Sequence, residues 1–135
     1  MEKRKVGIIG CGNISHKYIE TLHTVFNNTE VYALTDQNLE NARIRQQGFQ
    51  IPVICSTNEE LLSMPEIEIV VILTNPVSHY EVVRSSLQAG KHTYVEKPLA
   101  LTREEGRELL DLAKKNRVML CAAPDSILEI GRAHV

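Results

Sequence analysis

The sequence has little excess charge and no long apolar run. Its 135 residues include 15 Lys and Arg and 17 Asp and Glu, which gives a formal net charge of −2 and a pI near 6.2. Such a balance gives no electrostatic footprint for nucleic acid or for an anionic membrane. No run approaches the roughly 18 apolar residues of a membrane span, and no signal-peptide core precedes the first apolar run. We therefore expect a cytoplasmic protein that contacts neither nucleic acid nor a membrane.

Cysteine is scarce, and tryptophan is absent. Cys11, Cys55 and Cys121 are odd in number, far apart and without a Cys-x-x-Cys pair, so neither a disulfide framework nor a zinc site is indicated. We interpret them as small buried residues near strand ends, although the position of Cys11 in a glycine turn leaves its oxidation open. No metal ligand set is expected. Surface or packing positions are predicted for three histidines that lack partners at metal spacing, namely His16, His23 and His92.

Apolar runs alternate with amphipathic segments, and 43% of the residues are hydrophobic and 24% charged, as in an ordinary single domain. The alternation predicts parallel strands joined by right-handed helical crossovers. Strands are expected at 5–9, 31–35, 51–55, 68–73, 92–96 and 118–122. Helices are expected after residue 12 and at about 39–47, 57–62, 77–89 and 103–116, with stops at Gly48 and Gly90 and capping boxes at Thr57 and Thr102. The predicted fold is an α/β Rossmann doubly wound sheet with six strands in the order 3-2-1-4-5-6.

The first strand ends in closely spaced glycines. Gly10 lets the backbone reverse at positive φ, Gly12 removes a side chain that would block a phosphate, and the small Ser15 lets the following helix pack closely. The amino end of that helix offers N–H groups and a positive dipole end. We predict that a pyrophosphate binds at this turn, to Gly10, Gly12, Asn13 and Ile14. An ordinary strand-to-helix turn is the alternative, because Ser15 stands where the fingerprint has its third glycine.

An acidic residue follows the second strand. Asp36 lies 21 residues after Ser15, close to where the fingerprint places the acid that accepts the ribose hydroxyls of NAD. Its carboxylate would also repel a 2′-phosphate, and Gln37 supplies no guanidinium to attract one, so NAD is expected rather than NADP. The alternative is that Asp36 caps the helix that starts near Leu39.

Two further loops follow the fourth and fifth strands. Thr74-Asn75-Pro76 and Glu96-Lys97-Pro98 come at the carboxyl ends of their strands, as do the glycine turn and Asp36. In the order 3-2-1-4-5-6, ligands bind in the crevice between the carboxyl ends of strands one and four. We therefore expect all four turns to face one crevice.

Together these motifs resemble the glucose–fructose oxidoreductase/inositol dehydrogenase family (Gfo/Idh/MocA). The resemblance covers about residues 4–123, and its most specific part is the string Ala89-Gly90-Lys91-His92-x-x-x-Glu96-Lys97-Pro98-Leu99-Ala100. It implies NAD(P)-dependent hydride transfer on a sugar, polyol or related carbonyl compound by a homo-oligomeric full-length protein. The chain departs from the family at Ser15 and at Thr74-Asn75-Pro76, where the family has glycine and Thr-Pro-Asn.

The resemblance also implies roles in the second half of the chain. Three residues are expected on the nicotinamide side of the cofactor, namely Thr74, Asn75 and His79, and Glu96 is also expected among the cofactor-binding residues. Lys97 is expected near both nicotinamide and substrate, where an ammonium stabilises charge on a substrate oxygen; Glu96 is a candidate to hold it. The alternatives are that His79 only packs and that Glu96 and Lys97 form a solvated pair at a strand end. The sequence leaves the isomer of the Lys97–Pro98 bond open.

We assign residues 1–123 to the NAD(P)-binding domain. In the family a substrate domain follows, and residues 124–128 look like its start. Residues 129–135 read as the translation of a common sequencing-library adapter, so we interpret them as a foreign tail. The chain is therefore expected to be a truncated dehydrogenase that binds nucleotide weakly and turns over little.

Two other functions use a glycine turn with an acid. One is a non-catalytic NAD(P)-sensing module that regulates a partner, and the effect of replacing Lys97 distinguishes it from the enzyme. The other is an S-adenosylmethionine-binding domain, which the Glu96-Lys97-Pro98 context disfavours.

Overall fold

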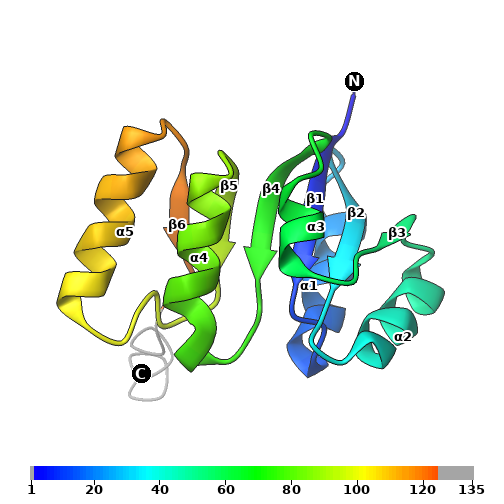
Figure 1. Cartoon of the computed structure of the whole chain (residues 1–135). Coiled ribbons are helices and arrows are strands. Elements are labelled where there is room, and N and C mark those ends of the chain that lie inside the picture. The colour runs from blue at the N-terminus through cyan, green and yellow to red at the C-terminus, as the bar shows by residue number, and fades with distance from the viewer. Residues whose placement is uncertain (1, 125–135) are drawn as a thin grey trace, which may run out of the picture.

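The computed structural model describes residues 2–124, which form one parallel sheet (Figure 1). Six strands lie in the order β3-β2-β1-β4-β5-β6, and every neighbouring pair is parallel. The strands are β1 (Arg4–Ile9), β2 (Thr29–Thr35), β3 (Val53–Ile54), β4 (Ile67–Ile72), β5 (His92–Val95) and β6 (Leu120–Ala122). The predicted Rossmann fold and strand order are therefore confirmed. The proposed start of a second domain and the proposed foreign tail, apart from Pro124, lie outside the described residues.

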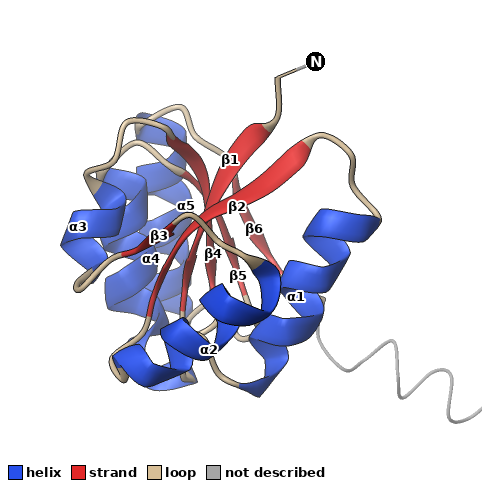
Figure 2. Cartoon of the chain, turned by 90° about the vertical axis from the view of Figure 1, so that its right-hand side faces the viewer, coloured by secondary structure: helices blue, strands red, loops and turns tan. Residues whose placement is uncertain are grey.

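Helices cover both faces of the sheet (Figure 2). On one face lie α1 (Asn13–Thr24) and α2 (Leu39–Phe49), and on the other lie α3 (Asn58–Leu62), α4 (His79–Gln88) and α5 (Arg103–Lys115). A short 3-10 turn, η1 (Pro76–Ser78), precedes α4. The division follows from right-handed crossovers, because β1-β2-β3 and β4-β5-β6 run outward from the centre in opposite directions.

The central strands supply the core. In β1, Val6 and Ile8 belong to the apolar cluster beneath α1 and α2, whereas Ile9 belongs to the cluster beneath α3, α4 and α5. In β4, Val71 and Ile72 divide between the two clusters in the same way. All five side chains are at most 5% exposed. Such burial is expected of central parallel strands that are covered on both faces.

Capping residues begin and end several helices where the sequence predicts. The Thr57 hydroxyl accepts a hydrogen bond from the Glu60 N–H at 3.1 Å, and the Thr102 hydroxyl accepts one from the Glu105 N–H at 3.1 Å. Gly90 follows α4 with φ +77°. Both capping residues and the stop at Gly90 are confirmed.

The end of α2 differs from the prediction. Gly48 does not stop the helix, which continues to Phe49 and is capped by Gln50 at φ 56°. The Phe49 ring packs against two rings of α1, with centroid distances of 5.0 Å to His16 and 6.1 Å to His23. Because this packing holds Phe49 on the helix, it outweighs the low helix propensity of glycine. Surface or packing positions were predicted for His16 and His23, and both side chains are exposed while their rings pack against Phe49.

The burial predicted for the three cysteines is confirmed for two of them. Cys11 and Cys55 are buried, but Cys121 is exposed, so the prediction of burial is wrong for Cys121. Its strand, β6, is the last strand on one side of the sheet, and only the neighbouring Leu120 packs against the core beneath α5. Residues of opposite parity in β6 therefore lie on a face that α5 does not cover.

Residues 2–124 contain neither a helix that could span a membrane nor a cluster of metal-ligating side chains. None of the helices there combines the length and apolar character that a bilayer crossing requires. In the same range, no group of three or more His, Cys, Asp or Glu residues could hold a metal ion.

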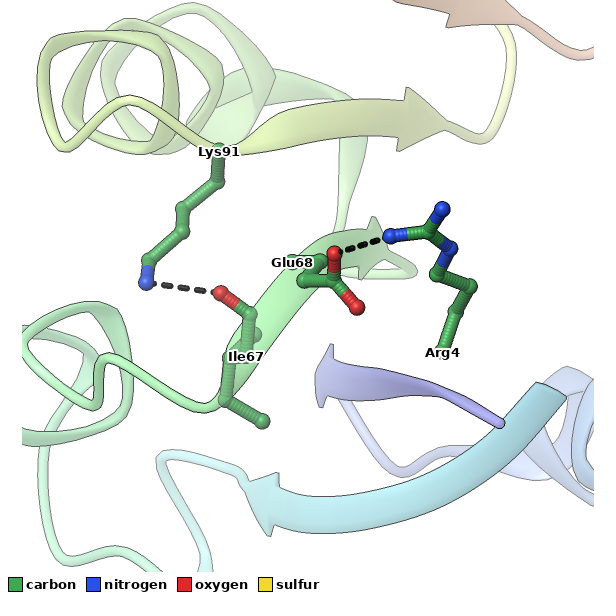
Figure 3. A network of polar contacts seen from close by, with 4 residues as sticks. All are labelled: Arg4, Ile67, Glu68 and Lys91. Carbon is green, nitrogen blue, oxygen red and sulfur yellow. Dashed lines mark hydrogen bonds and ion pairs between the residues drawn. The ribbon is translucent and has the colours of Figure 1, made fainter. Parts of the chain in front are cut away.

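Polar contacts fasten the amino end of β4 (Figure 3). The Lys91 ammonium is buried and donates to the carbonyl oxygens of Met64 at 2.7 Å and Ile67 at 2.8 Å. Burial lowers the pKa of Lys91. On the other side of β4, the Arg4 guanidinium lies 2.6 Å from the Glu68 carboxylate, an exposed pair that contributes little stability. Lys91 thus links the loop before β4 to the loop before β5.

Replacing Lys91 by Met should destabilise the fold. The variant keeps most of the apolar length of the side chain, but the buried Ile67 carbonyl and the partly buried Met64 carbonyl lose a donor, which costs about 1–3 kcal/mol. Urea unfolding measures the difference, with Lys114→Met as the control because Lys114 is exposed on α5. If both variants changed the free energy of unfolding by less than about 0.5 kcal/mol, Lys91 would have no structural role.

Candidate functional site

The turn between β1 and α1 requires glycine at Gly10. Its φ is +103°, and a Cβ there would lie 2.7 Å from the carbonyl carbon of Leu73, just after β4. Both the backbone conformation and the close approach disfavour any side chain. The Gly10 N–H donates to Thr35 O at 2.9 Å, and the Leu73 N–H donates to Ile9 O at 2.8 Å. The carboxyl ends of β2, β1 and β4 are thereby held together.

Gly12 differs, because nothing within the described residues requires glycine there. Its φ is −74°, and a Cβ would meet no atom within 4 Å. No side chain caps the amino end of α1, where Gly12, Asn13 and Ile14 are exposed. The first N–H groups of a helix have no partner within the helix, so this uncapped end suits an anion.

The Ser15 hydroxyl links the turn to α2. Ser15 is fully buried, as its small size predicts. Its hydroxyl donates to Gly12 O at 2.6 Å and accepts from Arg45 Nε at 2.9 Å, while Arg45 Nη2 donates to the same Gly12 carbonyl at 3.1 Å. A glycine at position 15 could not join this set of contacts. The sequence analysis missed Arg45, because it lies 30 residues from Ser15 and no local pattern marks it.

The Asp36 carboxylate lies between the glycine turn and α2. It accepts hydrogen bonds from the Cys11 N–H at 2.6 Å and the Asn38 N–H at 2.8 Å. The cap of α2 is Asn38, whose Oδ1 accepts from the Glu40 N–H at 3.1 Å. The structure therefore does not support the alternative in which Asp36 is the helix cap.

The Cys11 thiol is poorly suited to oxidation. Burial and, to a lesser extent, the Asp36 carboxylate raise the pKa of Cys11 to about 12. Its Sγ lies 3.5 Å from the carbonyl oxygen of Thr35. Because the thiolate is the reactive form, a buried thiol that stays protonated at neutral pH is inert.

Loops from both halves of the sheet line one cleft of about 250 Å³. Five residues predicted for the site lie in its wall: Gly10, Gly12, Asp36, Thr74 and Asn75. Other polar groups come from Gln37, Asn58 and Ser78. Asn58 was not predicted, because the capping box before it marks a helix start and not a cleft. The expected crevice at the carboxyl ends of β1 and β4 is therefore present.

His79 is buried and is not part of the cleft wall. Its side chain is 1% exposed, with Nδ1 lying 2.6 Å from Pro98 O and Nε2 2.9 Å from Thr74 O. Each ring nitrogen thus lies within hydrogen-bond distance of a main-chain carbonyl oxygen, and the two carbonyls belong to different loops. Of the two alternatives for His79, the structure supports packing, and the ring ties the loop after β4 to the loop after β5.

Glu96 is held by α1. The Tyr18 hydroxyl donates to the Glu96 carboxylate, and burial together with this hydrogen bond raises the pKa of Tyr18. The Glu96 N–H donates to Ile72 O at 3.0 Å. The Glu96 carboxylate thus pairs with Tyr18, and the ion pairs among residues 2–124 do not include one between Glu96 and Lys97. Tyr18 is 78 residues from Glu96, and no pattern in the sequence indicated the contact.

Lys97 follows β5 at the same end of the sheet as the glycine turn. Its peptide bond to Pro98 is cis. Lys97 is exposed, and none of the ion pairs among residues 2–124 includes it. It does not line the cleft, because β4 separates β5 from β1. Of the four turns expected to face one crevice, the Glu96-Lys97-Pro98 turn is therefore the one that does not line it.

The match to known families covers nearly all of the described chain. Residues 4–123 match the model of the oxidoreductase family with an NAD-binding Rossmann fold, Gfo/Idh/MocA. The chain belongs to this family. The assignment that the sequence motifs indicated is therefore confirmed, and the described residues form the NAD-binding Rossmann domain of the family.

The proteins to which this chain is similar are longer than it is. An inositol 2-dehydrogenase/D-chiro-inositol 3-dehydrogenase of Lactiplantibacillus plantarum is 35% identical over 113 residues, which are 82% of this chain and 32% of that protein. Biliverdin reductase from Synechocystis, solved with biliverdin and NADP+, has a TM-score of 0.82 and 28% identity, with 88% of this chain and 37% of that chain covered. A 3-ketoreductase from Actinomadura kijaniata, solved with TDP-benzene and NADP, has a TM-score of 0.83 and 26% identity, with coverages of 90% and 38%. The chain spans about a third of the length of the curated relative.

The Thr74-Asn75-Pro76 order, which departs from the family's Thr-Pro-Asn, has a local explanation. Asn75 Oδ1 accepts from the Ser78 N–H at 3.2 Å, and Pro76 begins η1, where its missing N–H and fixed φ are tolerated. The Ser78 hydroxyl donates to Thr74 Oγ1 at 2.7 Å. The altered order thus forms a capped turn, and Thr74 and Asn75 still line the cleft.

Alanine at each turn glycine should separate folding from binding. Gly10→Ala should lower the free energy of unfolding by about 2 kcal/mol or more, because it combines a strained φ with a backbone clash. Gly12→Ala should change it by less than about 0.5 kcal/mol, yet weaken dinucleotide binding, because the methyl group enters the mouth of the turn. Urea unfolding and NADH fluorescence titration measure the two effects. Equal destabilisation by both changes would contradict this assignment of roles.

Proposed function

We propose that this chain is the nucleotide-binding half of an NAD(P)-dependent oxidoreductase that transfers hydride to or from a sugar, polyol or related carbonyl substrate. The observation that carries the proposal is Gly12, whose missing side chain is required by neither strain nor packing and leaves room for a ligand. The uncapped amino end of α1 beside it suits a pyrophosphate. From there the cleft extends to Asp36 in one half of the sheet and to Thr74 in the other.

In this proposal the adenosine ribose binds at Asp36. A carboxylate has about four acceptor sites. The N–H groups of Cys11 and Asn38 and, at 3.5 Å, the side-chain amide of Asn41 take three of them, so a ribose hydroxyl still finds an acceptor. The negative charge disfavours a 2′-phosphate, and Gln37 in the cleft wall is uncharged. We therefore propose NAD rather than NADP, although two of the related solved structures hold NADP.

The nicotinamide is proposed to lie beyond Thr74 and Asn75, towards Glu96 and Lys97. A dinucleotide that starts at the end of β2 and crosses β1 and β4 reaches the loop after β5 next, because of the strand order. There the exposed Lys97 ammonium would hydrogen-bond a substrate oxygen and stabilise the charge that develops on it during hydride transfer. In the full-length protein, the polypeptide outside this domain would bind and orient the substrate.

Replacing Asp36 by Ala should weaken NADH binding about tenfold, because hydrogen bonds to the ribose are lost. The same change should weaken NADPH binding less or strengthen it, because a like charge near the 2′-phosphate is removed. Fluorescence titration of the purified chain with each nucleotide measures both affinities.

Asp111→Ala is the control for this experiment, because Asp111 is an exposed acid on α5. Equal NADH affinity for the unsubstituted chain and the Asp36 variant would remove the ribose assignment. Failure of the unsubstituted chain to bind NADH at millimolar concentration would remove the proposed function.

In the full-length protein, Lys97→Ala should lower kcat about 100-fold, the size of effect seen when one donor to a developing charge is lost. NADH affinity should change little, because the amine acts on the substrate oxygen. Steady-state kinetics with a panel of polyols, alongside NADH titration, separates the two, and Lys114→Ala serves as the control. Unchanged turnover would favour the non-catalytic NAD(P)-sensing module.

A further inference from the structure

Arg45 on α2 contacts the glycine turn between β1 and α1. Its Nε donates to the Ser15 hydroxyl at 2.9 Å, and its Nη2 donates to the Gly12 carbonyl at 3.1 Å. Although 30 residues separate Arg45 from Ser15, α1 and α2 lie on the same face of the sheet (Figure 2). The guanidinium is therefore fixed at two points beside the start of α1.

The Arg45 guanidinium reaches the surface of the turn. Arg45 is half-buried, but Gly12 is exposed, and so is the hydrogen bond between them. Within residues 2–124, the hydrogen bonds of Arg45 use Nε and Nη2, so the two N–H groups of Nη1 make none. Burial and the Asp36 carboxylate raise the pKa of Cys11, whereas the Arg45 charge acts to lower it. The positive charge thus acts on a residue inside the turn.

The nucleotide cleft itself offers no positive charge to a pyrophosphate. Among the described residues that line it, Asp36 is the only charged one, and its charge is negative. The Asp36 carboxylate accepts from the Cys11 N–H at 2.6 Å, so it also lies at the turn. An anion placed beside a carboxylate is repelled unless a cation lies near both. Arg45 is the cation that the hydrogen bonds hold at this turn.

We propose that Arg45 supplies positive charge to the pyrophosphate at the glycine turn and that the Ser15 hydroxyl holds it in place. This inference rests on the proposed function, because it assumes that the turn binds a dinucleotide. Arg45 does not line the cleft, so its charge acts on the anion across the turn. There it adds to the dipole end of α1, which is equivalent to about 0.5 elementary charge. Ser15 thus has a role beyond its small size.

A structural role for Arg45 alone is the alternative. The Gly12 carbonyl also accepts from the Ser15 N–H at 3.1 Å and from the Ser15 hydroxyl at 2.6 Å. Gly12 and Ser15 therefore keep hydrogen bonds to one another when Arg45 is replaced. Because no buried group loses its last partner, replacing Arg45 should change the free energy of unfolding little. Its effect on ligand binding can then be measured in a folded chain.

Arg45→Met tests the charge in the 135-residue chain. The variant keeps an apolar side chain without the charge, and it should bind NADH about fivefold or more weakly, as expected for a partly exposed charge beside an anion. Arg43→Met is the matched control. It removes the same charge from the same helix, but Arg43 is exposed and pairs with the exposed Glu40 at 3.5 Å. This control should bind NADH within about twofold of the unsubstituted chain.

Three further measurements separate the charge from a structural role. Arg45→Lys should recover most of the lost NADH affinity, because an ammonium keeps the charge without the planar two-point contact. In about 1 M KCl, where the Debye length is about 3 Å, the affinity difference between Arg45→Met and the unsubstituted chain should shrink. Ser15→Gly should weaken NADH binding in the unsubstituted chain but not in Arg45→Met, since the hydroxyl acts through Arg45. Fluorescence titration measures these affinities, and urea unfolding checks that each variant is folded.

Equal NADH affinity of folded Arg45→Met and the unsubstituted chain would overturn the inference. Unfolding of Arg45→Met, or a loss of affinity that neither lysine nor high salt reduces, would overturn it in favour of a structural role. An equal loss in Arg43→Met would assign the effect to the net charge of the chain. In all these cases the unsubstituted chain still binds NADH, so the proposed function stands. If the unsubstituted chain does not bind NADH at millimolar concentration, the proposed function fails and this inference fails with it.

Discussion

The pairing of β1 with β4 is the constraint on which the site depends. These strands join the two halves of the sheet, with Ile9 opposite Ile72, and the chain reverses at Gly10 directly against the backbone after Leu73. Only a residue without a side chain permits this approach, because a Cβ would lie 2.7 Å from a main-chain carbon. The cleft has walls in both halves, and the two residues in this contact, Gly10 and Leu73, both line it.

Much of the fold and part of the site could be predicted from the sequence, because the signals are local. These signals are a glycine turn after an apolar strand, a hydroxyl residue three positions before a glutamate, and the alternation of strands and helices. Each can be recognised from residues that are neighbours in the sequence. Strand order then follows from handedness. These rules sufficed to bring Gly10, Gly12 and Asp36 to one end of the sheet. Gly48 was mispredicted because the packing of Phe49 overrides a local propensity.

Contacts between distant side chains could not be predicted. Examples are the contact of Arg45 with Ser15, the contact of Tyr18 with Glu96 and the burial of the His79 ring between two loops. These contacts depend on how the helices pack against the sheet, which hydrophobic periodicity does not specify. The exposure of Cys121 was missed for a related reason. A strand pattern shows which residues share a face, but not whether a helix covers that face.

Lys91 and the cleft lie at opposite ends of the same strands. The buried ammonium fastens loops at the amino ends of β4 and β5, whereas the residues that face a ligand follow the carboxyl ends. Rigidity and recognition are therefore encoded in two separate sets of positions. Natural variation or protein engineering can alter the loops after the strands to suit a different ligand while the fastening at the other end keeps the scaffold intact.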